Sequence, residues 1–267
     1  MAAPSHADIA HIDYLLHLAD NAVVLGQRNG EWCGHGPVLE EDIAMTNMSL
    51  DLIGQARMLY QHAASLMGND ATEDSLAYFR DAHVFRNYTL LELPHHGALV
   101  GYAIDNRDYA ITIVRNFLYS SLMLLVWERL QKSSDTQLAA IAAKSLKEVR
   151  YHVRHAGDWL VRLGDGTTES HQKAQAALDH LMPYTQEFWS ASDFEKSVMS
   201  KGIGVDVCSL REPWEAQLQT TLNEATLQMP KTTGFTTTGK HQTHSEHLTY
   251  LLDEMQSLAR RHPEGVW

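Results

Sequence analysis

The chain has 267 residues, 44% of them hydrophobic, and a formal net charge of -12. This hydrophobic content suffices for a sizeable buried core, so disorder is not expected to dominate. The acidic balance argues against a protein that neutralises nucleic-acid phosphates, because that requires Lys and Arg gathered on one face. No run of Gly and Pro is long enough to act as an interdomain linker, which predicts one domain over residues 1–267.

The cysteines and the apolar runs bear on the compartment. Cys33 and Cys208 form no CxxC pair, so neither a zinc site nor a disulfide framework is indicated, and a reducing compartment fits. Residues 1–25 lack the basic start and the uninterrupted apolar stretch of a signal peptide. The most apolar run, residues 117–127, is about half as long as a membrane span. A cytoplasmic protein without a membrane partner is therefore expected.

Helical spacing of apolar residues is the main signal at the start of the chain. Spacings of three and four predict a first helix from about residue 9 to Gly30. A second helix of roughly eight turns is predicted over residues 38–67, with Gly68 at its end. The inward face predicted for it holds Met45, Met48, Leu52, Gln55, Leu59, Ala63 and Leu66.

Two more long helices are predicted further along. A short helix over residues 73–80 precedes a break at Pro94 and Gly97, and the third long helix then runs through Arg129. The fourth begins after Asp135, a suitable N-cap, and stops at Gly164. The inward face predicted for it holds Leu138, Ala142, Ser145, Val149, His152, Ala156, Trp159 and Leu163.

The rest of the sequence also favours helices. They are predicted over residues 168–190, 193–200, 209–228 and 243–261, with a Thr- and Gly-rich loop at 230–241 and one weak strand candidate at 203–207. Four long amphipathic helices with buried faces predict an all-α protein, a four-helix bundle with additional C-terminal helices. Because such bundles often hold cofactors between facing helices, a metal site is the first function to consider.

A di-iron carboxylate site takes one Glu from each of two helices and Glu-x-x-His from each of the other two. An acidic residue three positions before a His occurs only at Asp8/His11 and at Glu92/His95. Pro94 keeps the second pair out of a regular helix, and the first pair lies at the extreme start of the first helix. No metal ligand set of this kind is therefore expected.

His152, on the inward face of the fourth long helix, has two interpretations. We interpret it as a core histidine satisfied by a neighbour such as Gln55, with Glu148 four residues before it as a further possible partner. Asp51 and Glu148 are then structural carboxylates near the core. The alternative is an unorthodox metal site built from His152, Glu148 and Asp51, or from a pair of histidines near the C-terminus.

That pair of histidines is His244 and His247. Thr243 and Glu246 have the spacing of a capping box at the start of the last helix, which we take as the explanation of this segment. Zinc binding by the two histidines is the alternative. No GxGxxG, P-loop or GxSxG motif is present to suggest other chemistry.

Five segments carry a resemblance to a known family. They are RNGEWCGH at 28–35, LDLIGQAR at 50–57, KEVRYH at 147–152, NEATL at 223–227 and the closing stretch 244–267. They resemble the C subunits of bacterial phenylacetyl-CoA epoxidases. The resemblance implies a ferritin-like structural subunit that pairs with a homologous catalytic A subunit, which holds a di-iron centre.

The resemblance also implies the other components and the reaction. These are a small bridging B subunit and a reductase with FAD and an iron–sulfur cluster, which delivers electrons from NADPH. The complex inserts one oxygen atom from O₂ into the aromatic ring of phenylacetyl-CoA. An oxygenase in its own right and an acyl-CoA binding module are the rival interpretations of this chain.

The resemblance finally implies where the catalytic paralogue's iron ligands would fall. Its first Glu-x-x-His corresponds to Leu52 and Gln55, its second to Val149 and His152, and its helix-one glutamate to Val23. No residue is assigned to the ligand of the third long helix. Since only His152 keeps a ligand type, no catalytic, cofactor-binding or metal-binding residue is expected in this chain.

Overall fold

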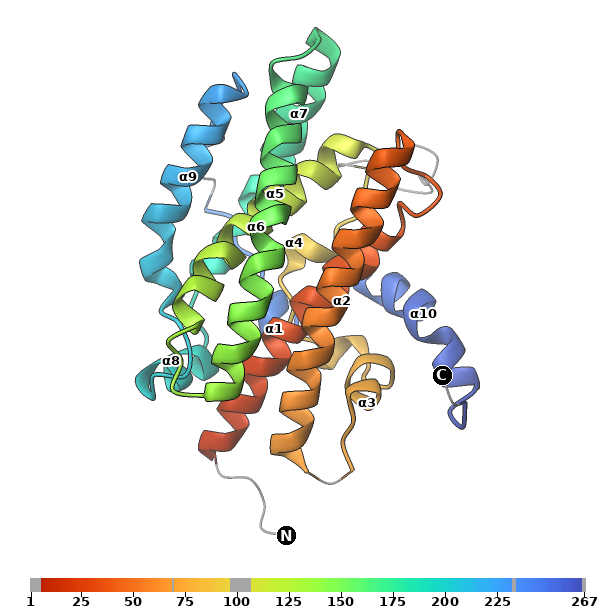
Figure 1. Ribbon diagram of the computed structural model, residues 1–267, viewed down its shortest axis with the longest axis vertical. Helices are drawn as coiled ribbons and strands as arrows, with labels where there is room; N and C mark the ends of the chain where they lie inside the picture. Colours follow the sequence, from red (N-terminus) through yellow and green to blue (C-terminus); the bar gives the residue numbers. More distant parts are fainter. Residues whose placement is uncertain (1–5, 69, 97–106, 232–233, 266–267) are drawn as a thin grey trace.

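The computed structural model describes residues 6–68, 70–96, 107–231 and 234–265. Gly97 and the side chain of Asp8, both used in the sequence predictions, lie outside the described residues. Two pairs of long helices form the bundle, as Figure 1 shows: α1 (His6–Gly30) packs most extensively on α2 (Leu39–Met67), and α5 (Tyr109–Leu130) on α6 (Thr136–Gly164). The predicted all-α bundle is confirmed.

Shorter elements surround the bundle. In chain order they are α3 (Glu73–Tyr78), η1 (Ala82–Val84), α4 (Thr89–Glu92), α7 (Thr168–Leu181), η3 (Met182–Trp189), α8 (Asp193–Ser200), η4 (Val207–Leu210), α9 (Arg211–Glu224), η5 (Gly239–His241) and α10 (Glu246–Arg261). The helices α9 and α10 lie on opposite flanks, α9 against α5 and α6, and α10 against α1, α3 and α4 (Figure 1). The described residues contain no strand, only an isolated bridge between Thr238 and Thr243.

The long helices end where the sequence predicts. The side chain of Asp135 caps α6 by accepting hydrogen bonds from the amides of Gln137 and Leu138. The last residue of α6, Gly164, packs so closely on the chain beyond α9 that an added Cβ would lie 2.1 Å from the Ala225 carbonyl oxygen. A glycine is therefore required there for packing as well as for the helix end.

The inward faces of α2 and α6 are predicted correctly except at their ends. Leu66 is 40% exposed, and Trp159 and Leu163 are only partly buried. A straight helix has 3.6 residues per turn, so a strict seven-residue spacing drifts off the buried face over three heptads. On α6 the buried positions accordingly move on by one residue, to Leu160 and Gly164.

The helix α5 forms the centre of the main hydrophobic core. By length and composition it could cross a membrane, but 89% of its most apolar 18-residue window is buried inside the protein. Phe117, Leu118 and Leu122 are among its side chains that pack with residues of α1, α2, α6, α7 and α9 in one core cluster. This burial makes α5 a core helix of the bundle. That a single domain covers the whole chain stays a prediction.

Candidate functional site

The five positions that the resemblance matches to iron ligands all face inward. Val23 on α1, Leu52 and Gln55 on α2, and Val149 and His152 on α6 are between 1% and 7% exposed. The three aliphatic members belong to the main core cluster. The structure therefore agrees with the predicted inward orientation, while the correspondence to ligand positions stays a prediction.

The two polar members of this set are satisfied across the α2–α6 contact. The Nε2–H of His152 donates to Asp51 Oδ2 at 3.0 Å, and Gln55 Nε2 donates to Glu148 Oε2 at 2.9 Å. The interpretation of His152 as a satisfied core histidine is confirmed. Gln55 as its partner was wrong, because the antiparallel packing places His152 opposite Asp51 and places Gln55, one turn further along, opposite Glu148.

Two more pairs extend this contact toward both ends of α2. Glu41 Oε2 accepts from His155 Nε2 at 2.8 Å and from the Tyr109 hydroxyl at 2.6 Å. At the other end, Asp135 Oδ2 accepts from His62 Nε2 at 2.6 Å. We call the resulting row of contacts the α2–α6 seam; its pairs are Glu41–His155, Asp51–His152, Gln55–Glu148 and His62–Asp135.

The residues at the five positions do not fit a di-iron carboxylate centre. Val23, Leu52 and Val149 offer no donor atom, and a di-iron site requires several anionic oxygens to balance the charge of the metal. Gln55 and His152 already bond to side chains of the seam. The three aliphatic side chains fill the interior, and the hydrogen bonds of Gln55 and His152 fix the axial register of α2 against α6.

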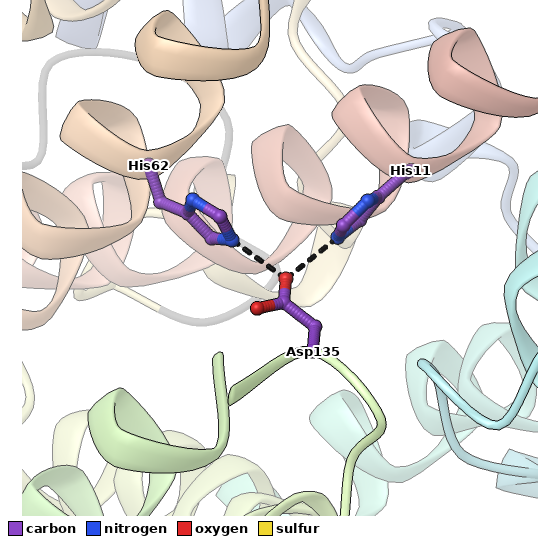
Figure 2. A group of neighbouring side chains, drawn as sticks. All are labelled: His11, His62 and Asp135. Carbon is purple, nitrogen blue, oxygen red and sulfur yellow. Dashed lines mark hydrogen bonds and ion pairs between the residues drawn. The ribbon is translucent and has the colours of Figure 1, made fainter. Parts of the chain in front are cut away.

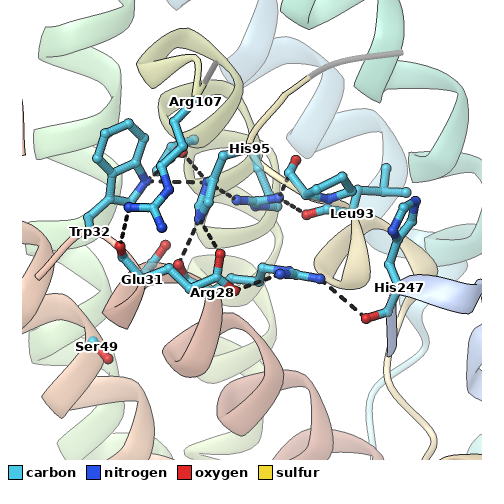
Figure 3. A network of polar contacts seen from close by, with 12 residues as sticks. Arg28, Glu31, Trp32, Ser49, Leu93, His95, Arg107 and His247 are labelled. Atoms are coloured by element: carbon cyan, nitrogen blue, oxygen red, sulfur yellow. Dashed lines mark hydrogen bonds and ion pairs between the residues drawn. The ribbon is translucent and has the colours of Figure 1, made fainter. Parts of the chain in front are cut away.

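A second polar cluster, shown in Figure 3, surrounds the buried His95. Its Nε2–H donates to the Arg28 carbonyl oxygen at 2.9 Å, while its Nδ1 accepts from Thr112 Oγ1 at 2.6 Å and from Arg115 Nη2 at 2.8 Å. The Trp32 indole N–H donates to the same Thr112 hydroxyl at 2.9 Å. These contacts fix the chain that follows α1 against α5, although Arg115 Nε is buried and has no partner among the described residues.

Burial governs the protonation of this cluster. Burial lowers the pKa of His95 to about 4 and, together with the nearby charge of Arg28, lowers the pKa of Arg115 to about 9. Although burial alone would raise the pKa of Glu31, the hydrogen bond from His95 and the charge of Arg28 lower it to about 2. Near neutral pH the cluster therefore combines a neutral imidazole with two guanidinium groups and one carboxylate.

The segment around His244 is held by Glu92 instead of by a capping box. Ser245 is the N-cap of α10, and no side chain caps this helix. Glu92 is fully buried and accepts hydrogen bonds from the His244 ring, from the Ser245 amide at 2.8 Å and from the Ser245 hydroxyl at 2.7 Å. The predicted pairing of Thr243 with Glu246 was wrong, because Thr243 instead forms the bridge with Thr238.

The zinc alternative for this segment finds no geometric support. The second ring nitrogen of His244 bonds the Phe85 carbonyl oxygen at 2.9 Å, so both of its nitrogens are engaged. The backbone oxygen of His247 accepts from Arg28 Nη2 at 3.3 Å, a contact that Figure 3 draws. Burial opposes protonation of His244, but the hydrogen bond and charge of Glu92 outweigh it and raise its pKa.

Sequence reasoning missed the buried charges that hold residues 237–240. Lys240 is fully buried and lies 2.9 Å from Glu195 Oε2, and its amide donates to Glu187 Oε1 at 2.8 Å. The Thr237 hydroxyl donates to Glu187 Oε2 at 2.8 Å. A lone Lys in a Thr- and Gly-rich loop carries no sequence signal of burial, so only the structure identifies this attachment.

These features define the class of the protein: an all-α, ferritin-like bundle in which aliphatic side chains and paired polar groups fill the interior. The chain belongs to the family described as "Phenylacetic acid catabolic protein", whose model matches residues 1–267. It is 44% identical over 254 residues to the C subunit of the 1,2-phenylacetyl-CoA epoxidase of Escherichia coli (strain K12). That match covers 95% of this chain and 98% of the relative.

Proposed function

We propose that this chain is the non-catalytic, structural subunit of a cytoplasmic phenylacetyl-CoA epoxidase, acting in phenylacetate catabolism. Its partners are a homologous A subunit with the di-iron centre, a small B subunit, and a reductase carrying FAD and iron–sulfur. The observation that supports the proposal is the burial of aliphatic side chains at Val23, Leu52 and Val149, the positions that the resemblance matches to carboxylate ligands of the catalytic subunit.

An exposed apolar row on α2 supports a role in assembly. Four apolar side chains of this helix are largely exposed: Leu39 (72%), Ile43 (52%), Leu50 (61%) and Ile53 (41%). Successive members lie four, seven and three residues apart, which places all four on one side of the helix. Apolar side chains gathered in this way are typical of a surface that another protein covers. We propose that this face is covered by the catalytic partner.

The decisive experiment is reconstitution. Phenylacetyl-CoA-dependent NADPH consumption is measured with the catalytic, bridging and reductase components, with and without this chain. We expect coupled turnover only when the chain is present. Full turnover in its absence would contradict the proposed structural role. Turnover by this chain without the catalytic partner would establish the rival interpretation, an oxygenase in its own right. Iron analysis of each purified component adds an independent readout.

Matched variants test the proposed face. Leu50→Glu places a charge on the exposed row without touching the core, so we expect a folded chain that no longer co-purifies with the catalytic partner. Leu258→Glu changes a residue of α10 that is 55% exposed and should co-purify normally. Equal co-purification of both variants would contradict the assignment of this face. Affinity of the isolated chain for coenzyme A thioesters would instead favour the acyl-CoA binding interpretation.

A further inference from the structure

Three potential metal ligands meet at the end of the bundle where α1 begins and α2 ends. Figure 2 shows His11 of α1 and His62 of α2 pointing at the carboxylate of Asp135, the residue before α6. The Nε2 atoms of the two histidines lie 2.8 and 2.6 Å from the same oxygen, Asp135 Oδ2. All three ligand atoms lie within 4.8 Å of one another.

The carboxylate is fixed in an orientation that suits a ligand. Its other oxygen, Oδ1, accepts from the amides of Gln137 at 2.9 Å and Leu138 at 3.1 Å, which leaves Oδ2 directed at the histidines. The two imidazole rings are nearly perpendicular, with 85° between their planes. The two Nε2 atoms therefore approach one point from different directions, and a carboxylate with its second oxygen held in this way is typical of metal sites.

We propose that His11, His62 and Asp135 form a site for a divalent transition metal of the zinc class, with a fourth position left for water. Two imidazoles and one carboxylate are ligands that zinc prefers, at about 2.0–2.2 Å. Tetrahedral ligands at these bond lengths lie about 3.3 Å apart. Binding therefore requires the Nε2 atoms of His11 and His62 to move away from Asp135 Oδ2 by roughly 0.5 and 0.7 Å, respectively. The proposal is independent of the function proposed above.

Metal binding requires a change of tautomer at both histidines, because an imidazole coordinates through the lone pair of a nitrogen that carries no proton. In the metal-free site each Nε2–H donates to Asp135; on binding, that proton moves to Nδ1 and the Nε2 lone pair coordinates. Nδ1 of His62 is buried and has no partner among the described residues, so it lacks the acceptor that usually orients a ligating imidazole. The site should therefore bind metal less tightly than one in which both imidazoles have such an acceptor.

The test is a calorimetric titration of the full chain with Zn²⁺ after treatment with a chelator. We expect one saturable site, which His11→Gln, His62→Gln and Asp135→Asn each weaken at least tenfold. The two Gln variants keep a hydrogen-bond donor for Asp135, and Asn keeps the helix cap. His83→Gln and His241→Gln remove histidines outside this site and serve as controls that should bind Zn²⁺ as the unaltered chain does.

Two further readouts decide the result. Co²⁺ in place of Zn²⁺ should give the visible absorption of a tetrahedral nitrogen and oxygen site, and the three ligand variants should lose it. Saturating Zn²⁺ should raise the melting temperature of the unaltered chain, on the order of 5 °C, and not that of the ligand variants. Circular dichroism confirms folding of each variant. No saturable binding, or binding that the ligand variants retain, would overturn the proposal.

Discussion

Lys240 and Glu195 form an ion pair of 2.9 Å in which the two side chains are 0% and 2% exposed. The pair joins η5 to the first turn of α8, and the same Glu195 oxygen also accepts from the Ser192 amide at 2.7 Å. Burial alone would raise the pKa of Glu195, but the charge of Lys240 outweighs it and lowers the pKa. A charge so deeply buried is tolerated only while its partner remains in place.

Removing the charge of Lys240 should therefore destabilise the fold. Lys240→Met leaves Glu195 as an uncompensated buried charge and should lower the free energy of unfolding by about 3–5 kcal/mol. Adding Glu195→Gln should restore a large part of this loss, because the neutral amide can still accept from Ser192. Urea denaturation of the single and double variants measures both effects. A double variant no more stable than Lys240→Met would contradict the explanation.

The interior of the bundle should reject a restored carboxylate. Leu52→Glu buries an unpaired charge at a position that is 2% exposed, and we expect a loss of about 3 kcal/mol or more in the free energy of unfolding, with no gain of iron or activity. Leu50→Glu, on the exposed side of the same helix, should change stability by less than about 0.5 kcal/mol. Chemical denaturation and iron analysis check both variants. Iron binding by Leu52→Glu would contradict this prediction.

Stability should fall below neutral pH because two histidines are buried in the neutral form. Burial lowers the pKa of both His17 and His95 to about 4, from an unfolded value of 6.5. The unfolded chain therefore binds protons first, so their contribution is complete above pH 6.5 and is lost as the pH falls toward 4. Between these two pH values, each histidine should lower the free energy of unfolding by about 1.4 kcal/mol for each unit by which the pH falls.

This slope can be measured by urea denaturation between pH 7 and pH 5. His95→Gln should reduce the slope of the unfolding free energy against pH by the contribution of one histidine, about 1.4 kcal/mol per pH unit. Replacing the exposed His83 in the same way should leave the slope unchanged. An identical slope in the unaltered chain and in His95→Gln would show that His95 does not cause the pH dependence.

The start of α10 offers a comparison between adjacent residues. His244→Ala leaves the fully buried Glu92 without its ring partner and should cost about 2–3 kcal/mol. Thr243→Ala should cost less than about 0.5 kcal/mol, because no side-chain cap is lost. Thermal or urea unfolding of the two variants separates the explanations, since a capping box would require Thr243 to be the costlier position.

The helices could be predicted because their apolar spacing reports burial along a single element. The limits of α1, α2 and α6, and the N-cap at Asp135, follow from such local signals. The prediction fails near the ends of the buried faces, since a seven-residue pattern does not follow a straight helix. Leu66 and Trp159 illustrate this drift.

The polar contacts could not be predicted because they join residues far apart in the chain. His62 and Asp135 are 73 positions apart, and no spacing rule links them. The partner of His152 depends on the axial register of α2 against α6, which helical periodicity leaves undetermined. Lys240 lies in the predicted Thr- and Gly-rich loop, and a Lys is rarely buried without a partner, so only tertiary packing supplies the carboxylate that permits its burial.

The attachment of residues 237–247 has a consequence for synthesis of the chain. Three buried carboxylates, Glu92, Glu187 and Glu195, take hydrogen-bond donors from this late segment. While the protein is still emerging from the ribosome, these carboxylates lack those donors, even though every long helix of the bundle has been made. The nascent bundle therefore reaches its native stability only after residues 237–247 have emerged, and messages cut short before this segment should yield chains that quality-control proteases remove.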